Sequence, residues 1–238
     1  MKVRVTVIGC SPAWPNPGGA HSGYLVESHG SRLLLDCGPG VLSRLRERNL
    51  LPIDAIAITH FHLDHCGDLV PWVWLASSGH LKLGRSKLFV PPGGRAILAQ
   101  IAEFWGHSSM FEAVFAVDEY EAGQSVFAAA FELLPIQLAH YETVAFGLRV
   151  TDTDGRTLAY SGDTGPCPAL HTLARDADLF LCEATLASAD SDAHPRGHLA
   201  AEEVLALRAR RTVLTHRPAE LGTPRGVERA ADGEALDL

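Results

Sequence analysis

One short stretch of this sequence carries most of its metal-binding chemistry. Residues 59–68 read THFHLDHCGD, which places three histidines and one aspartate within six positions: His60, His62, Asp64 and His65. Neutral imidazole and ionised carboxylate are the ligand types that suit zinc and its first-row neighbours. A solvated, histidine-rich loop is the alternative interpretation, but this combination of types and spacing favours a metal site.

Other metal-competent side chains lie directly after apolar segments that predict β-strands. His140 ends a run that begins at Ser125, and His216 follows the apolar segment Arg211 to Thr215. In α/β proteins, sites collect at the carboxyl ends of strands, so we expect these side chains to converge. The set at predicted strand ends is Asp36, His60, His140, Asp163, Glu183 and His216.

The segments that must position these residues alternate between strands and helices. Continuous apolar character at Ala55 to Ile58 suits a strand that is buried on both faces. The aromatic segment Trp105 to Tyr120 is predicted to be irregular and to flank the pocket, and the tail from Pro218 to be loosely held. Strands are predicted at 3–7, 24–27, 32–35, 55–58, 87–90, 125–138, 143–150, 157–161, 179–182 and 211–215, and helices at 41–48, 68–76, 95–104, 169–175 and 200–209.

Composition sets broader limits on the protein. With 238 residues and 47% apolar content, we expect residues 1–238 to form a single domain with a substantial core. The net charge of -8 argues against a surface made for long nucleic acids. Five scattered cysteines indicate reduced thiols in a cytoplasmic protein. The start reads as a strand rather than a signal peptide, and no run approaches a membrane helix in length.

The histidine stretch, together with Tyr160-Ser161-Gly162-Asp163-Thr164, resembles the signature of the metallo-β-lactamase superfamily of metallohydrolases. The resemblance covers nearly the whole chain. It implies an α/β fold, a four-layer αββα sandwich with its site along one edge between two sheets. It also implies two divalent transition metal ions, zinc or alternatively manganese. The implied ligands are His60, His62 and His140 for one ion, Asp64, His65 and His216 for the other, and Asp163 as the bridge.

Two such cations, about 3.5–4 Å apart, would clamp a hydroxide and polarise a substrate, because the pKa of a bound water falls toward 7. Asp64 would then also orient or deprotonate the attacking water. Asp36 has two interpretations that remain open together. It could cap the helix predicted at 41–48, or it could support the histidine motif, as the residue at this position does in the superfamily.

A second pair of motifs indicates a branch of the superfamily. Glu183-Ala184-Thr185, with Gly197-His198-Leu199 after it, is similar to the ribonuclease Z-like phosphodiesterases, in which the corresponding Glu and His assist the leaving oxygen. A histidine held by a carboxylate is a competent general acid. The alternative is a surface Glu183 and a helix-capping His198. No glycine-rich arm fits between His140 and Asp163, which puts precursor-tRNA cleavage in doubt.

We therefore expect a dinuclear phosphodiesterase that acts on small phosphodiesters such as cyclic nucleotides. A ribonuclease Z-type tRNA 3′ endonuclease and a thioester or lactone hydrolase are the alternatives, because fold does not fix function. A non-catalytic metal-binding scaffold is the least favoured, since the whole ligand set is present. Monomer and homodimer both stay open, and His107 is unassigned. Candidate substrate contacts are Arg149, His21, Ser22 and the loop amides around Gly162 and Gly165.

Overall fold

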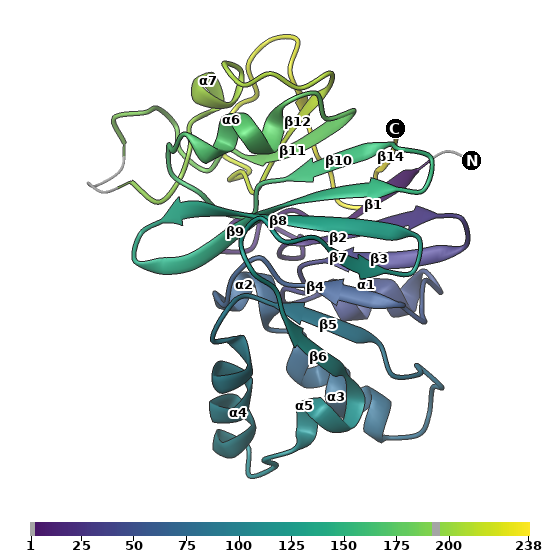
Figure 1. Ribbon diagram of the computed structural model, residues 1–238. Helices are drawn as coiled ribbons and strands as arrows, with labels where there is room; N and C mark the ends of the chain where they lie inside the picture. Colours follow the sequence, from purple (N-terminus) through teal and green to yellow (C-terminus); the bar gives the residue numbers. More distant parts are fainter. Residues whose placement is uncertain (1–2, 192–195) are drawn as a thin grey trace.

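Two seven-stranded β-sheets pack face to face at the centre of the protein, and helices cover both outer faces (Figure 1). The computed structural model describes residues 3–191 and 196–238. The arrangement is the four-layer αββα sandwich that the sequence predicts. Within the described residues, no helix is both long enough and apolar enough to cross a membrane.

The first sheet is built mainly from the amino-terminal half and has the order β14-β1-β2-β3-β4-β5-β6. Its strands are antiparallel from β14 to β3 and parallel from β3 to β6. The strands are β1 (Arg4–Gly9), β2 (Gly23–Ser28), β3 (Ser31–Leu35), β4 (Ala55–Ala57), β5 (Lys87–Val90), β6 (Ala116–Glu119) and β14 (Ala235–Asp237). The helices that accompany it are α1 (Val41–Glu47), α2 (Leu63–Cys66), α3 (Leu69–Ser77), α4 (Gly94–Phe104) and α5 (Met110–Val114).

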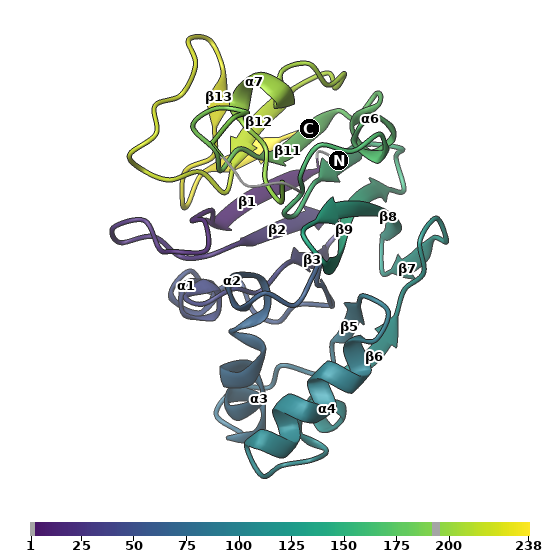
Figure 2. The same ribbon diagram turned by 90° about the vertical axis from the view of Figure 1, so that its left-hand side faces the viewer.

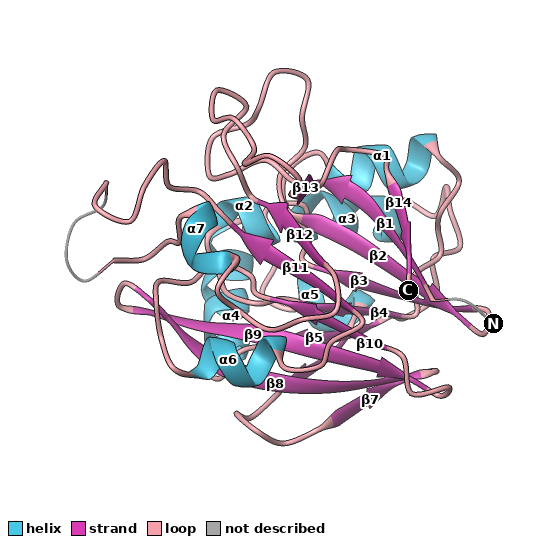
Figure 3. Ribbon diagram, turned by 90° about the horizontal axis from the view of Figure 1, so that it is seen from above, coloured by secondary structure: helices cyan, strands magenta, loops and turns pink. Residues whose placement is uncertain are grey.

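The second sheet has the order β13-β12-β11-β10-β9-β8-β7. It is antiparallel from β7 to β10 and parallel from β10 to β13. Its strands are β7 (Val126–Ala128), β8 (Phe131–His140), β9 (Thr143–Asp152), β10 (Thr157–Tyr160), β11 (Leu179–Glu183), β12 (Thr212–Thr215) and β13 (Glu228–Arg229). Two helices, α6 (Ala169–Ala174) and α7 (Ala201–Val204), lie over its outer face, as Figure 3 shows from above.

Alternating side chains divide the core into three apolar layers. The layer between the sheets includes Tyr24, Phe146 and Tyr160, and it draws on strands of both sheets. Neighbouring side chains of the same strands, such as Ile56 and Phe180, point outward against the helices. This alternation explains why β4 reads as continuously apolar, because it is covered on both faces. The edges of the sandwich, not its faces, are therefore left for chemistry.

Three parts of the chain differ from the sequence prediction. The tail after Pro218 is not loose, because β14 pairs with β1 and buries Leu236, and so closes an otherwise open sheet edge. Residues 105–120 are not irregular, since they contain α5 and β6 (Figure 1). Strand β6 lies beside β5 at the end of the first sheet (Figure 2), and α5 belongs to the helical layer that covers this sheet. The helix predicted at 200–209 ends at Val204, where the buried apolar positions stop and Leu205 is half exposed.

Candidate metal centre

The polar residues predicted at strand ends lie at the carboxyl ends of their strands. His140 and Glu183 are the last residues of β8 and β11, and Asp36 and His216 directly follow β3 and β12. His60 comes shortly after β4, and Asp163 comes shortly after β10. The structure brings all seven predicted ligands together in two groups that share one residue.

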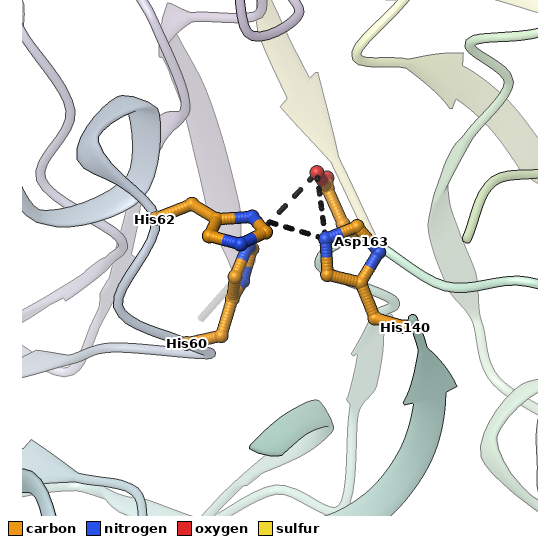
Figure 4. A group of neighbouring side chains, drawn as sticks. All are labelled: His60, His62, His140 and Asp163. Carbon is orange, nitrogen blue, oxygen red and sulfur yellow. Dashed lines mark hydrogen bonds and ion pairs between the residues drawn. The ribbon is translucent and has the colours of Figure 1, made fainter. Parts of the chain in front are cut away.

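The first group consists of His60, His62, His140 and Asp163, whose potential ligand atoms lie within 4.8 Å of one another. The two motif histidines face His140 across the centre, with Asp163 beside them (Figure 4). His140 Nε2 lies 3.1 Å from His62 Nδ1 and 3.9 Å from Asp163 Oδ2. His60 Nε2 lies 4.0 Å from the same carboxylate oxygen. Three imidazoles and a carboxylate converging on one point are a suitable first-row metal site.

The second group consists of Asp64, His65, Asp163 and His216, and all four are buried. His216 Nε2 lies 3.0 Å from Asp64 Oδ2 and 3.4 Å from Asp163 Oδ1. His65 Nε2 lies 3.2 Å from the same Asp163 oxygen. Thus Asp163 turns Oδ2 toward the first group and Oδ1 toward the second, which is the arrangement required of a bridging ligand.

Most of the histidines are held by a partner on the ring nitrogen that points away from the centre. His65 Nδ1 lies 2.7 Å from Asp36 Oδ2, and His140 Nδ1 lies 2.7 Å from the carbonyl oxygen of Gly197. His216 Nδ1 faces Thr185 Oγ1 at 3.0 Å. Such partners fix ring orientation and leave Nε2 free to bind a metal. The rings are therefore preorganised for this purpose.

Asp36 has the second of the two roles left open by the sequence. Its carboxylate accepts hydrogen bonds from the Thr59 amide at 2.7 Å and the Tyr160 hydroxyl at 2.7 Å, besides its contact with His65. It does not cap α1, because the Leu42 amide at the start of that helix donates to Asp68 Oδ2 at 2.8 Å. Since Tyr160 belongs to the second sheet, Asp36 also ties the two sheets together beneath the centre.

Removing the Tyr160 hydroxyl tests how firmly this tie holds the sandwich. Tyr160→Phe should lower the free energy of unfolding by about 1.5–3 kcal/mol, because a buried hydrogen bond to a charged acceptor is lost. Chemical denaturation of metal-free protein is the measurement. The control is Tyr120→Phe, which removes an equally buried hydroxyl from the neutral Ile58 carbonyl and should cost about 0.5–1.5 kcal/mol. Equal losses in the two variants would contradict a charged Asp36.

The carboxylates of the centre are held in the ionised form that binds metals. Burial alone would raise the pKa of Asp163, but the neighbouring His216 and His65 lower that pKa well below its usual value. Burial also acts to raise the pKa of Asp64, but the hydrogen bond from His216 and the charge of the nearby His65 outweigh it and lower the pKa. Both side chains therefore offer anionic oxygens at neutral pH.

The histidines differ in protonation. Burial lowers the pKa of His60 well below its usual value and also lowers the pKa of His140, so both rings are neutral. Burial opposes protonation of His65 as well, but Asp163 and Asp36 outweigh it and raise the pKa of His65 well above normal. A cation that binds at His65 must therefore displace a proton.

Unsatisfied polar atoms show that the centre fits metal ions. Among the described residues, the buried atoms His60 Nε2, His65 Nε2 and Asp163 Oδ1 have no hydrogen-bond partner. Polar atoms buried without a partner are costly, and cations bound at the two groups would satisfy all three of them. The chemistry of the donor set agrees with this, since it consists only of imidazole nitrogens and carboxylate oxygens.

Glu183 and His198 lie beside the centre as a pair. Glu183 is completely buried, and its Oε1 lies 3.0 Å from His198 Nδ1. The His198 ring stacks against His216 and meets the edge of His140, with ring centroids 6.0 and 5.0 Å apart. A surface glutamate and a helix-capping histidine are therefore excluded. The pair lies where it could deliver a proton to a group bound between the two metal positions.

Two of the substrate contacts predicted from the sequence, Arg149 and the Gly165 amide, already have partners within the protein. The Arg149 guanidinium donates to the Leu173 carbonyl at 2.7 Å and so fixes α6. The Gly165 amide donates to the Ala139 carbonyl at 2.6 Å, so it is not available to a phosphate. His21 Nδ1 contacts the Pro12 carbonyl. Ser22 is fully buried. The contacts predicted for His21, Ser22 and Gly162 stay predictions.

The aromatic residues outside the centre have other partners. His107 packs edge-on against Trp74, with ring centroids 5.0 Å apart, and both side chains belong to the helical layer of the first sheet. Trp72 is buried in the core, whereas Trp74 is 43% exposed. His107 thus has a packing partner, and nothing in its contacts places it in the centre.

Tyr141 belongs to the centre although sequence reasoning did not indicate it, and it packs against Gly197, which the sequence indicated only as part of the His198 motif. The Tyr141 ring lies 5.0 Å from the His140 ring and 5.7 Å from the His198 ring, and the side chain is 45% exposed. A Cβ atom on Gly197 would lie only 2.2 Å from the Tyr141 ring, so only glycine fits there. No pattern in a single sequence could have indicated a contact between segments so far apart.

Fold and centre together define a metallohydrolase of the β-lactamase fold. Residues 31–217 match the family model described as Beta-lactamase superfamily domain, and the chain therefore belongs to this family. The Mycobacterium tuberculosis protein Rv1339 is 37% identical over 227 residues, which cover 92% of this chain and 82% of that protein.

One further relative and one solved structure bear on the branch of the superfamily. The ribonuclease Z of Salinibacter ruber is 30% identical over 290 residues, covering 97% of this chain and 89% of its own. The crystal structure of the metallo-β-lactamase fold protein YhfI from Bacillus subtilis superposes with a TM-score of 0.83 at 26% identity, and the match covers 100% of both chains. These relatives confirm the resemblance to the ribonuclease Z branch that was inferred from the sequence.

Proposed function

We propose that this protein is a phosphodiesterase that hydrolyses small phosphodiesters, such as cyclic nucleotides, with two divalent transition metal ions. The pairing of Glu183 with His198 beside the centre carries this proposal. Alkoxide is a poor leaving group, and its departure gains from a positioned general acid, whereas a thiolate needs little such help. The pair therefore favours phosphodiesters over thioesters as substrates.

The bound metals would lower the pKa of an attacking water toward 7 and polarise the phosphoryl oxygens. Zinc is the first choice for the donor set, with manganese as the alternative. His60, His62 and His140 would hold one ion, and His65 and His216 the other. Asp64 would hold the second ion and also orient the attacking water, and Asp163 would bridge the two.

The size of the substrate is argued from charge and topology. The chain carries a net charge of -8, and long RNA draws much of its affinity from many cationic contacts to phosphates. Between His140 and Asp163 there are only β9, a tight turn and β10, with no extension that could grip a tRNA. A ribonuclease Z-type activity is the second candidate, supported by the ribonuclease Z relatives, and lactone or thioester hydrolysis is the third.

A panel of substrates should separate these candidates. Zinc-loaded protein should hydrolyse bis(4-nitrophenyl) phosphate and at least one cyclic nucleotide, while precursor tRNA, a lactone and a thioester should be cleaved poorly. Protein stripped with a chelator and assayed in parallel is the control for metal dependence. Efficient, site-specific trimming of tRNA 3′ ends at physiological salt would overturn the proposal. Preference for the thioester or the lactone would overturn it as well.

A further inference from the structure

We propose that Thr185 is a positioning residue that joins the Glu183–His198 pair to the metal ligand His216 through its hydroxyl group. The inference rests on the proposed function, because it assumes that His216 holds a metal and that His198 acts as the acid. It concerns a side chain that touches neither the substrate nor a metal.

Thr185 lies between the two parts of the centre. Its Oγ1 is 2.8 Å from Glu183 Oε2 on one side and 3.0 Å from His216 Nδ1 on the other. Thr185 is buried, with only 7% of its surface exposed, so water has little access to replace these contacts. The opposite carboxylate oxygen, Glu183 Oε1, faces His198 Nδ1 at 3.0 Å. One hydroxyl therefore completes a continuous connection from His216 to His198.

Counting protons gives this connection a direction. A His216 ring that binds a metal through Nε2 carries its proton on Nδ1, and the nearest acceptor for that proton is Thr185 Oγ1. The single Thr185 proton then has two acceptors within reach, Glu183 Oε2 at 2.8 Å and the His216 carbonyl oxygen at 2.9 Å. The carboxylate is the stronger acceptor of the two, because hydrogen bonds to charged groups are the stronger ones. Glu183 receives further hydrogen bonds from the amides of Thr164, Thr185 and Leu199, so every group around it is a donor.

The direction has consequences at both ends. Glu183 Oε1 accepts a hydrogen bond from His198 Nδ1, which leaves His198 Nε2 to serve the reaction. At the other end, His216 keeps the tautomer and orientation that present Nε2 to the second metal position. Thr185 therefore sets two rings with one hydroxyl group.

The backbone on both sides of Thr185 is held as well. The buried guanidinium of Arg217 donates to the Ala184 carbonyl at 2.6 Å and to the Leu186 carbonyl at 3.2 Å. Arg217 also directly follows His216 in the chain. It therefore links the backbone beside His216 to the backbone on either side of Thr185. The position of Thr185 is thus built into the loop, and valine could replace threonine there with little change in shape.

The test compares Thr185→Val with Thr185→Ser. Loss of the hydroxyl should weaken binding of one of two zinc ions about 10–100-fold, because partners of ligands contribute that much to affinity. Thr185→Ser keeps the hydroxyl and should bind both ions as the unmodified protein does. Zinc alone is the probe, in competition with a chromogenic chelator. The matched control is Thr157→Val, which alters a buried threonine whose hydroxyl faces Thr151.

Hydrolysis provides the second readout. Thr185→Val should lose more turnover on phosphodiesters with poor leaving groups than on bis(4-nitrophenyl) phosphate. Unchanged zinc affinity in Thr185→Val, or equal weakening in Thr185→Ser, would overturn the inference. Because the zinc measurement needs no substrate, it decides the matter even if the phosphodiesterase proposal fails. Thr185→Ala, with thermal unfolding of the metal-free form, replaces the valine variant if that variant does not fold.

Discussion

Replacing Asp163 by alanine should empty both metal positions and reduce hydrolysis to the background of metal-free protein. The reason is that its two carboxylate oxygens face different groups, Oδ2 toward His60 and His140, and Oδ1 toward His65 and His216. Activation of water by the metals would supply several orders of magnitude in rate, and protein without metals would lack this activation. No other side chain of the centre belongs to both predicted ligand sets.

Single-group variants provide the comparison for Asp163→Ala. His140→Ala should weaken mainly the first metal position and Asp64→Ala mainly the second, and Asp64→Ala should also nearly abolish turnover. Elemental analysis of protein purified without chelator measures the metal content of each variant. One metal or none in the unmodified protein after reconstitution would contradict the dinuclear proposal. Retention of both metals by Asp163→Ala would contradict its role as the bridge.

Replacing His198 by alanine should slow hydrolysis while leaving the metal content unchanged. The expected loss is about 10²–10⁴-fold on substrates with poor leaving groups, which is the usual contribution of a general acid. Activated aryl esters need less protonation of the leaving oxygen, so their loss should be smaller. Steady-state kinetics on a series of aryl and alkyl phosphodiesters measures the difference.

His107→Ala is the matched control for this variant, because that histidine packs on Trp74 in the helical layer of the first sheet. It should leave both turnover and metal content unchanged. An equal loss on good and poor leaving groups in His198→Ala would mean that His198 does not act as the acid. A loss of metal in the same variant would assign His198 to the ligand set instead.

Much of the centre could be predicted from the sequence because its residues follow regular elements. Three of the ligands come at or shortly after the ends of apolar strands: His60, His140 and His216. The apolar pattern of each strand therefore predicts the edge of the sheet at which these side chains lie. The four-layer fold followed from the resemblance carried by the motif around His60 and by Asp163. The observed bounds of β3, β5 and β9 agree closely with the strands predicted from their apolar patterns.

The remaining features depend on pairings between distant segments. Tyr160 reaches Asp36 only because the two sheets face each other, and Thr185 meets His216 only because β11 and β12 are neighbours. Hydroxyl groups of this kind leave no periodic signal. The same limit explains the tail, where β14 is a strand only because β1 offers an unpaired edge. It also explains why Arg149 was wrongly predicted as a substrate contact, because its partner is the Leu173 carbonyl of α6, which covers the outer face of the sheet.

Because each ligand group is split between the two sheets, metals bound there would cross-link the halves of the sandwich. His60 and Asp64 belong to the segment after β4, whereas His140, Asp163 and His216 come from the second sheet. By mass action, an ion at one hundred times its dissociation constant would add about 2.7 kcal/mol to the stability of the folded chain. The folded population would then depend on the concentration of free metal around the protein. We expect a chain deprived of metal to open more often and to be degraded by proteases sooner.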